Sequence, residues 1–566
     1  MARRSRQQTQ RTSVLRGPDK DIPDNPDEVR AATRQETLPI AMIAVLLAFV
    51  ALLLCYQHGY MLLYGDAVAH LGNARRILDS RNPGLSQLGG VWLPLPHLLI
   101  LPFVQKMAWW QDGLAGAWPS LLCFVAGAAG FYRLARRLLV PRWAIVATAF
   151  YVLNPNLLYL STTAMTEPLF LALLVWLTLL TLECVDAIRS ASVPVVRSKL
   201  IQIALLIFAA VFTRYDGWIL GAVIWCMLAW MVLRDKKLRR AVAPAFTIFT
   251  VITVAGPLLW LAYNQHFFHD PLDFMRGPYS AAAIEKKTTP PGAPHYRGWH
   301  NLGWALIFYT RTAQVDAAAW ETGFALLAAA LCGLYMIVRR SFVGAHRAAI
   351  LLWLPLPFYL YSVAYGSVPI FIPQLYPHSY YNARYGMEML PALALFACVA
   401  LTGLERVWAD STPPVAQWMN PLALVLVVVN SFAMIYSVPL VLKEGIVNST
   451  TRVPFESAIA RQLESFRVGA PILMANSDHI GALQRAGIPL RQTLNEGDRD
   501  SWEAALAAPA DKAMYIVAIA GDPVAQAVAK HPDGLTELTV LCTTGQPCAR
   551  IYQSDRYGVV HAAPRP

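Results

Sequence analysis

The stretch Tyr64–Leu99, YGDAVAHLGNARRILDSRNPGLSQLGGVWLPLPHLL, decides the fold, because it places a crowd of charged residues directly behind a long apolar run at residues 39–60. That run is long enough to cross a bilayer core of about 30 Å as a helix. A charged group at membrane depth is costly unless it has a partner or a function. The stretch therefore predicts an interfacial segment of a membrane protein, with candidate site residues in it.

The composition indicates a polytopic membrane protein. The chain has 566 residues, of which 56% are hydrophobic and only 14% charged, and its mean hydropathy is +0.41. No ordinary soluble domain of this length has such values. Eleven apolar runs of roughly the spanning length recur along the first three quarters of the chain. The predicted spans lie at residues 39–60, 115–138, 143–160, 167–186, 200–214, 217–233, 242–263, 320–338, 348–366, 385–404 and 420–441.

Basic residues in the short loops predict the orientation. Segments such as RLARRLLVPR, RDKKLRR and RRSFVGAHR fall on alternate sides of successive spans, on the same side as the Arg-rich N-terminal tail. Lys and Arg in short loops stay cytoplasmic, so this side is the cytoplasm and the C-terminus lies outside. The net charge of +12 is explained by this topology, and no nucleic-acid partner is needed.

Three regions follow from the composition. Residues 1–38 are polar and predict a disordered cytoplasmic tail. Residues 39–442 form a mostly α transmembrane helical bundle, with outer loops at 61–114 and 264–319, and the first run is expected to remain as an anchor. Residues 443–566 predict a small extracytoplasmic α/β domain.

The C-terminal prediction depends on alternation between two kinds of segment. Strand-like APILMAN, KAMYIVAIA, LTELTVLC and ARIYQS alternate with helix-like DHIGALQRAG, DSWEAALAAP and DPVAQAVAKH. Cys542 and Cys548 are the cysteines of this region. On an oxidising face they could pair, and buried free cysteines are the alternative.

The first outer loop carries the leading catalytic candidate. Asp66 lies one helical turn before His70 on the same face. A carboxylate there could accept a proton from an acceptor hydroxyl, or bind a divalent cation together with His70. The alternative is an N-cap, in which Gly65 and Asp66 start a helix and the helix dipole favours Asp66. Arg75 and Arg76 follow, and they suit either a phosphate-bearing substrate or the headgroups around an interfacial helix.

The segment VWLPLPHLLILPF, residues 91–103, is broken too often by proline to be a good span. We expect a kinked or re-entrant helix at the interface, with Trp92 and His97 at headgroup level. His97 is therefore counted among the substrate-binding candidates.

Two further candidates stand at the outer ends of spans. Glu167, in STTAMTEPLF, is an acid at the same membrane level as Asp66, although an acid before Pro168 also starts a helix well. In FTRYDGW, Arg214 and Asp216 could hold a phosphate at the boundary or simply pair with each other.

The last candidate segment is PHSYYNARYGMEMLPALALF. Arg384 and Tyr385 enter a span here after a loop that contains His378. A guanidinium at this outer edge suits a phosphate, and snorkelling is the alternative. Glu388, one turn deeper, is the expected partner of Arg384.

In these elements the sequence resembles the GT-C superfamily of integral-membrane glycosyltransferases, in particular the protein-mannosyltransferase-like and aminoarabinose-transferase-like branch. The matching elements are YGDAVAHLGNARRI after the first span, TTAMTEPLF, FTRYDGW and ARYGMEMLPAL, in that order. The likeness covers roughly residues 39–440. Its strength comes from order and topology more than from any one motif.

The resemblance implies a sugar donor linked to polyprenyl phosphate, transfer with inversion on the extracytoplasmic face, and Asp66 as the base. Glu167 would be a second acid that positions acceptor or metal, and Arg214 and Arg384 would bind the lipid phosphate. It implies a bacterial inner-membrane enzyme that moves a hexosyl or pentosyl group. Ala67 follows Asp66 where family members show a second acid, which argues against a true protein mannosyltransferase.

Several alternatives stay open on sequence alone. The acceptor is a lipid, a glycan or a protein. A divalent cation is the one cofactor to consider, with Asp66, His70 and Glu167 as its ligands. The rival function is a secondary transporter or a flippase for lipid-linked sugars. Transporters often show paired halves with midplane charges, whereas these charges gather at the outer boundary.

Overall fold

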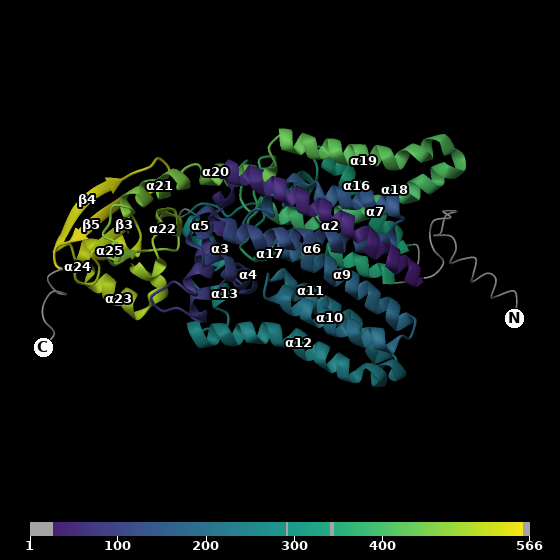
Figure 1. Cartoon of the computed structure of the whole chain (residues 1–566), viewed down its shortest axis with the longest axis horizontal. Coiled ribbons are helices and arrows are strands. Elements are labelled where there is room, and N and C mark those ends of the chain that lie inside the picture. The colour runs from purple at the N-terminus through teal and green to yellow at the C-terminus, as the bar shows by residue number, and fades with distance from the viewer. Residues whose placement is uncertain (1–25, 290–291, 340–344, 558–566) are drawn as a thin grey trace.

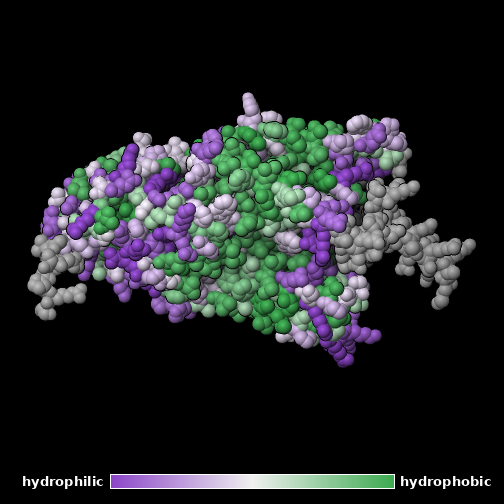
Figure 2. Space-filling view, in the orientation of Figure 1, coloured by the Kyte–Doolittle hydropathy of each residue, from purple (hydrophilic) through white to green (hydrophobic). Residues whose placement is uncertain are grey.

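Ten helices are long and apolar enough to cross a membrane in the computed structural model, which describes residues 26–289, 292–339 and 345–557. Their surface forms an apolar band with hydrophilic residues at both ends, as Figure 2 shows. The chain is therefore an integral membrane protein. The ten are Thr33–Gln57, Leu114–Leu138, Glu167–Arg189, Val193–Val211, Asp216–Arg234, Lys236–Phe268, Thr322–Arg339, His346–Tyr365, Ala383–Ala409 and Pro413–Ser449.

The predicted span at residues 143–160 is wrong as a single helix. It consists of α7 (Pro141–Val152) and a short α8 (Pro155–Leu160). The break has a local cause, because the Asn154 side chain caps α8 and a proline follows it. α7 alone is only about 18 Å long, so the segment crosses as the broken pair α7–α8, from Arg142 beside Glu405 on α18 (Leu390–Ser411) to Tyr159, which donates to the carbonyl of Tyr60 just past α2 (Pro26–Gln57).

The predicted N-terminal tail is also partly helical. The first helix, α2 (Pro26–Gln57), begins within the tail expected at residues 1–38, and residues 1–25 lie outside the described part of the chain.

The membrane bundle is built from α2 and a further set of helices, seen side by side in Figure 1. Its elements are α6 (Leu114–Leu138), α9 (Glu167–Arg189), α10 (Val193–Val211), α11 (Asp216–Arg234), α12 (Lys236–Phe268), α16 (Thr322–Arg339), η4 (Ala345–Trp353), α17 (Pro355–Tyr365), η5 (Ala383–Met389), α18 (Leu390–Ser411), α19 (Pro413–Tyr436) and α20 (Leu440–Ser449). α9 and the span formed by η5 and α18 are the most enclosed of the spans, and α9 places Glu167 in the centre while η5 places Arg384 and Glu388 there.

Both outer loops are structured. The first contains α3 (Gly65–Arg76), η3 (Leu85–Leu88), α4 (Leu95–Val104) and α5 (Met107–Asp112). As expected for the proline-broken segment, α4 is short, begins at prolines and contains Pro102. The second loop contains α13 (Asp273–Arg276), α14 (Ala281–Thr288) and α15 (Leu302–Ala317).

The C-terminal region has the predicted α/β architecture. Its five-stranded sheet has the order β2-β1-β3-β5-β4, in which β1 pairs in parallel with β2 and β3, and β5 is antiparallel to β3 and β4. Cys542 and Cys548 form a disulfide. The elements are α21 (Arg452–Leu463), β1 (Ile472–Met474), α22 (Ile480–Ala486), η6 (Leu490–Gln492), β2 (Thr493–Leu494), η7 (Glu496–Asp498), α23 (Asp500–Ala507), α24 (Pro509–Lys512), β3 (Tyr515–Ile519), α25 (Pro523–Lys530), β4 (Leu535–Leu541) and β5 (Ala549–Ser554).

This domain docks on the first outer loop, with α22 next to α3 and α5 (Figure 1). Gln484 donates to the carbonyl of Trp110, and Arg491 Nη1 lies 3.1 Å from Asp79 Oδ1. The loop that carries Asp66 is therefore held between the membrane bundle and the C-terminal domain.

Two glycines test the packing of α16 on α18. A Cβ on Gly333 would lie 1.9 Å from the backbone oxygen of Phe396, which cannot move aside, so Gly333→Ala should cost about 1–3 kcal/mol. A Cβ on Gly403 would meet only the flexible end of Met336, so Gly403→Ala should be near neutral. Thermal unfolding of both purified variants in detergent checks this, and equal losses would contradict the packing argument.

Candidate functional site

The buried guanidinium of Arg384 is the centre of the site. It lies on η5, and its side chain is 7% exposed. Its Nη2 is 2.5 Å from Asp66 Oδ2 at the start of α3, and its Nε is 3.1 Å from Glu167 Oε1 at the start of α9. Its Nη1 is 3.9 Å from Glu444 Oε1 on α20. Three helices far apart in sequence thus place a carboxylate on one cation.

Arg214 forms a second centre in contact with the first. Its Nε lies 3.1 Å from Asp216, which confirms that these two residues pair. Its Nη1 donates to Thr166 Oγ1 at 2.9 Å and lies 3.5 Å from Glu167, so Glu167 touches both guanidiniums.

Glu388 belongs to Arg214 and not to Arg384, so the predicted pairing is wrong. Its Oε1 lies 3.0 Å from Arg214 Nη2 and accepts a hydrogen bond from Tyr359 at 2.7 Å. The Tyr385 ring lies beside both cations, at 4.8 Å from the Arg384 guanidinium and 5.1 Å from that of Arg214. Such contacts stabilise a desolvated cation.

The cluster is rich in acid. Five carboxylates, from Asp66, Glu167, Asp216, Glu388 and Glu444, contact the two guanidiniums. Four of them are at most 4% exposed, whereas Asp66 is 41% exposed. Asp66 is therefore the acid of the cluster that a substrate can reach.

Glu444 and Gly386 complete the site and were not predicted from sequence. Glu444 accepts hydrogen bonds from Tyr64 and from the amide of Ala383, which positions η5. Its only sequence signal is a lone acid at the end of the last apolar run. Gly386 is required, because a Cβ there would lie 2.5 Å from the buried Asp316 carboxylate.

His70 does not join the acids. Its Nδ1 is hydrogen-bonded to His97 Nε2 at 2.9 Å, and its ring stacks on Trp92 with centroids 4.3 Å apart. Burial, followed by the charges of Arg384 and Arg214, lowers the pKa of His70 to about 3. Burial and the neighbouring His70 hold the pKa of His97 well below its usual value.

The predicted divalent-cation ligands Asp66, His70 and Glu167 do not fit a metal. The Arg384 guanidinium contacts both carboxylates, and Nδ1 of His70 is hydrogen-bonded to His97. Within the described ranges, no group of three or more His, Cys, Asp or Glu is arranged to hold a metal ion.

The remaining candidates lie outside the cluster. Arg75 pairs with Asp79 at 2.8 Å and donates to the carbonyl of Val104 at 2.7 Å, so its guanidinium ties α3 to α4. Arg76 donates to Asn73 and to the carbonyl of Gln87, towards the C-terminal domain. His378 is bonded to the carbonyl of Pro373.

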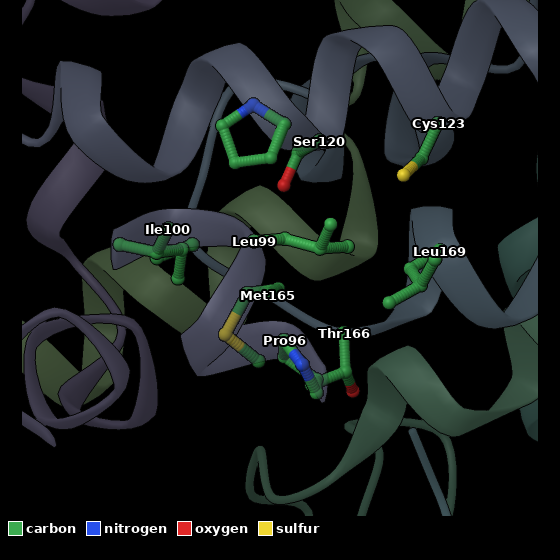
Figure 3. A pocket seen from close by; sticks show the side chains of 10 residues that line it. Pro96, Leu99, Ile100, Ser120, Cys123, Met165, Thr166 and Leu169 are labelled. Atoms are coloured by element: carbon green, nitrogen blue, oxygen red, sulfur yellow. The ribbon is translucent and has the colours of Figure 1, made fainter. Parts of the chain in front are cut away.

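A narrow, mostly apolar pocket with a cavity volume of about 20 Å³ is seen in Figure 3, and it adjoins the charged cluster at Thr166. α4, α6, and the turn before α9 supply its walls. Thr166 links the two features, because it lines the pocket and receives the hydrogen bond from Arg214. The lining residues are Pro96, Leu99, Ile100, Pro119, Ser120, Cys123, Ala164, Met165, Thr166 and Leu169.

Neither a protein-family model nor a curated protein matches the sequence. Among solved structures, ArnT from Cupriavidus metallidurans bound to undecaprenyl phosphate is similar, with a TM-score of 0.56 and 14% identity over 91% of this chain and 97% of that chain. Its apo state has a TM-score of 0.56 and 16% identity over 94% and 100%. An oligosaccharyltransferase from Archaeoglobus fulgidus in the apo form reaches a TM-score of 0.46, with 11% identity over 85% and 69%.

The similarity to ArnT establishes the fold. It confirms the predicted architecture, a helical membrane bundle with a small C-terminal α/β domain and the fold of ArnT.

The histidine pair gives the protein a predictable sensitivity to acid. Between about pH 6.5 and 3 the unfolded chain takes up a proton on His70 that the folded chain excludes, so the free energy of unfolding falls as the pH falls. The slope from His70 is about 1.4 kcal/mol per pH unit. Chemical denaturation at several pH values should show a shallower loss for His70→Asn, and an unchanged slope would contradict the neutral buried histidine.

Proposed function

We propose that the protein is a membrane glycosyltransferase that moves a sugar from a polyprenyl-phosphate carrier to an acceptor on the extracytoplasmic face. The observation that carries the proposal is the accessible Asp66 carboxylate on a buried Arg384, next to an apolar pocket. The similarity of the fold to ArnT, which has been seen bound to undecaprenyl phosphate, supports it.

Asp66 is the base in this proposal. A lone pair of the acceptor hydroxyl attacks the anomeric carbon while the bond from that carbon to the phosphate oxygen breaks. The hydroxyl proton passes to Asp66, and polyprenyl phosphate leaves with the bonding electrons. Attack from the side opposite the leaving group inverts the anomeric carbon.

Arg384 couples donor binding to this step. In the structure its Nη2 is occupied by Asp66. A donor phosphate that binds this edge of the guanidinium displaces Asp66, and the carboxylate then faces the acceptor without a cation that weakens it as a base. Arg214 is held by Asp216, Glu388, Thr166 and Tyr359, so its role is to fix Glu167 and the neighbouring backbone.

The cluster has more carboxylates than guanidiniums, and the additional negative charge has a role in the proposed reaction. As the leaving group departs, positive charge develops on the sugar ring. Prearranged acids such as Glu167 stabilise that charge in a site that excludes water. Glu167 Oε2 is buried and has no hydrogen-bond partner among the described residues, so its negative charge is not fully compensated there and acts on the site electrostatically.

The pocket marks where the first isoprenoid unit of the carrier enters, and its walls must move apart to admit that unit, because the cavity of about 20 Å³ has room for little more than one water. Its walls are mostly apolar, and its polar edge at Thr166 is shared with Arg214. A tail in this pocket brings the phosphate towards the two guanidiniums. The positive-inside pattern orients this end outward in a bacterial inner membrane, with the N-terminus in the cytoplasm.

The direct test is transfer from a synthetic polyprenyl-phosphate sugar by purified protein. Asp66→Asn should reduce turnover by about 10²–10⁴-fold. The fold should survive, because the residue is 41% exposed and the amide oxygen still accepts from Arg384. The control is Asp478→Asn, an exposed acid paired with Lys287 outside the cluster. Near-normal turnover of a folded Asp66→Asn protein would remove the assigned base.

Two cysteines provide a matched test of the pocket. Cys123→Trp fills space that the isoprenoid would use, so the KM for a long-chain donor should rise about tenfold or more with little change in kcat, because each displaced methylene is worth about 0.8 kcal/mol. Cys226→Trp, an exposed site on α11, is the control. Equal KM values for both variants would place the tail elsewhere.

A further inference from the structure

A second groove lies outside the charged cluster, where the C-terminal domain meets α5. It and its open mouth enclose about 660 Å³. Helices α21 and α22 form one side and the end of α5 the other. Its lining is mostly polar and consists of Gln111, Ser457, Ala460, Arg461, Glu464 and Arg485.

The groove carries an excess of positive charge. Glu456 behind it is buried and shared by two cations, at 2.8 Å from Arg452 and 3.8 Å from Arg485. Arg461 forms no ion pair within the part of the chain that the structure describes. Three guanidiniums therefore face two carboxylates, those of Glu456 and Glu464, which leaves one positive charge for an anion.

The groove lies at the level of the lipid headgroups. Gln111 on its rim comes just before Leu114, where the spanning helix α6 begins. Next to it, Trp109 packs against Trp118 with centroids 6.3 Å apart, and Lys106 lies 4.7 Å over the Trp109 ring. Tryptophan and lysine together at the end of a span are typical of a membrane interface.

The groove is also part of the joint between the two domains. Gln111 donates to the carbonyl of Arg485 at 3.2 Å, and Gln484 donates to that of Trp110. A ligand held by Arg461 and Arg485 on one side and by Gln111 on the other would therefore rest on both domains at once and stabilise their contact.

We propose that this groove binds the phosphate of an anionic phospholipid in the leaflet on which the C-terminal domain rests. A phosphodiester carries the single negative charge that the groove lacks. Arg461 and Arg485 supply charge-assisted donors, and the side-chain amide of Gln111 supplies a neutral one. The site is separate from the donor pocket and does not depend on the proposed transfer reaction.

Native mass spectrometry of the purified full-length protein in neutral detergent tests this site with phosphatidylglycerol, phosphatidylcholine and inorganic phosphate as probes. We expect phosphatidylglycerol to bind best and to raise the Tm. Arg461→Gln should weaken its binding about fivefold, because one cation near an anionic surface contributes about that much. Glu464→Gln, which removes an acid from the same groove, should strengthen it.

The matched control is Arg467→Gln, which makes the same charge change on an exposed part of the same domain outside the groove. Equal losses in Arg461→Gln and Arg467→Gln would overturn the proposal by showing only a general charge effect. Displacement of phosphatidylglycerol by millimolar inorganic phosphate would overturn the lipid assignment. Arg461 is exposed and unpaired in the described chain, so its variant should fold and give a readable result.

Discussion

The burial of two guanidiniums in one network of carboxylates is the constraint on which the rest of the structure depends. Arg214 and Arg384 are 14% and 7% exposed, and their acids come from five separate elements of the chain. A buried ion that loses its partner costs about 3–5 kcal/mol. Every element that supplies a partner must therefore arrive in place, so the network fixes the relative positions of α3, α9, α11, η5 and α20.

The same network explains why one of its acids suits chemistry. A carboxylate that is fully enclosed between cations is a poor base, since its charged form is stabilised and its protonation is disfavoured. Asp66 differs from the other four because it is 41% exposed at the mouth of the cluster, whereas they are buried. An anion that competes for Arg384 changes the environment of Asp66 without disturbing the deeper pairs. The four buried carboxylates thus hold the cluster together, and the exposed Asp66 is the carboxylate that suits the reaction.

The fold and most of the site residues can be predicted from the sequence, and the reason is physical. Spans are recognisable because apolar length is set by the bilayer, and charged residues at span ends are conspicuous because they are costly there. Glu167, Arg214 and Arg384 were found in this way. The prediction of one continuous helix at 143–160 is wrong because hydropathy does not reveal the helix break that Asn154 and Pro155 cause.

Which site residues pair with each other is harder to predict from the sequence than which residues belong to the site. Glu388 was assigned to Arg384 on helical spacing, but both lie on the 3₁₀ helix η5. Four residues along a 3₁₀ helix correspond to a rotation of about 120° away from the starting face, so Glu388 turns towards Arg214. His70 met a partner from α4 that no local pattern predicts. Long-range contacts of this kind depend on how the whole bundle packs.

The balance of positive and negative charge differs between two levels of the outer end of the molecule. The inner cluster has more carboxylates than guanidiniums, and the groove at the headgroup level has more guanidiniums than carboxylates. An anionic lipid is therefore attracted to the rim, whereas the inner cluster favours a group on which positive charge develops. A phosphate can enter the inner cluster only by exchanging with an acid that is free to leave, and Asp66, being the exposed one, is the acid that can do so. In the proposed reaction, the exposure of Asp66 therefore determines where the donor phosphate meets Arg384.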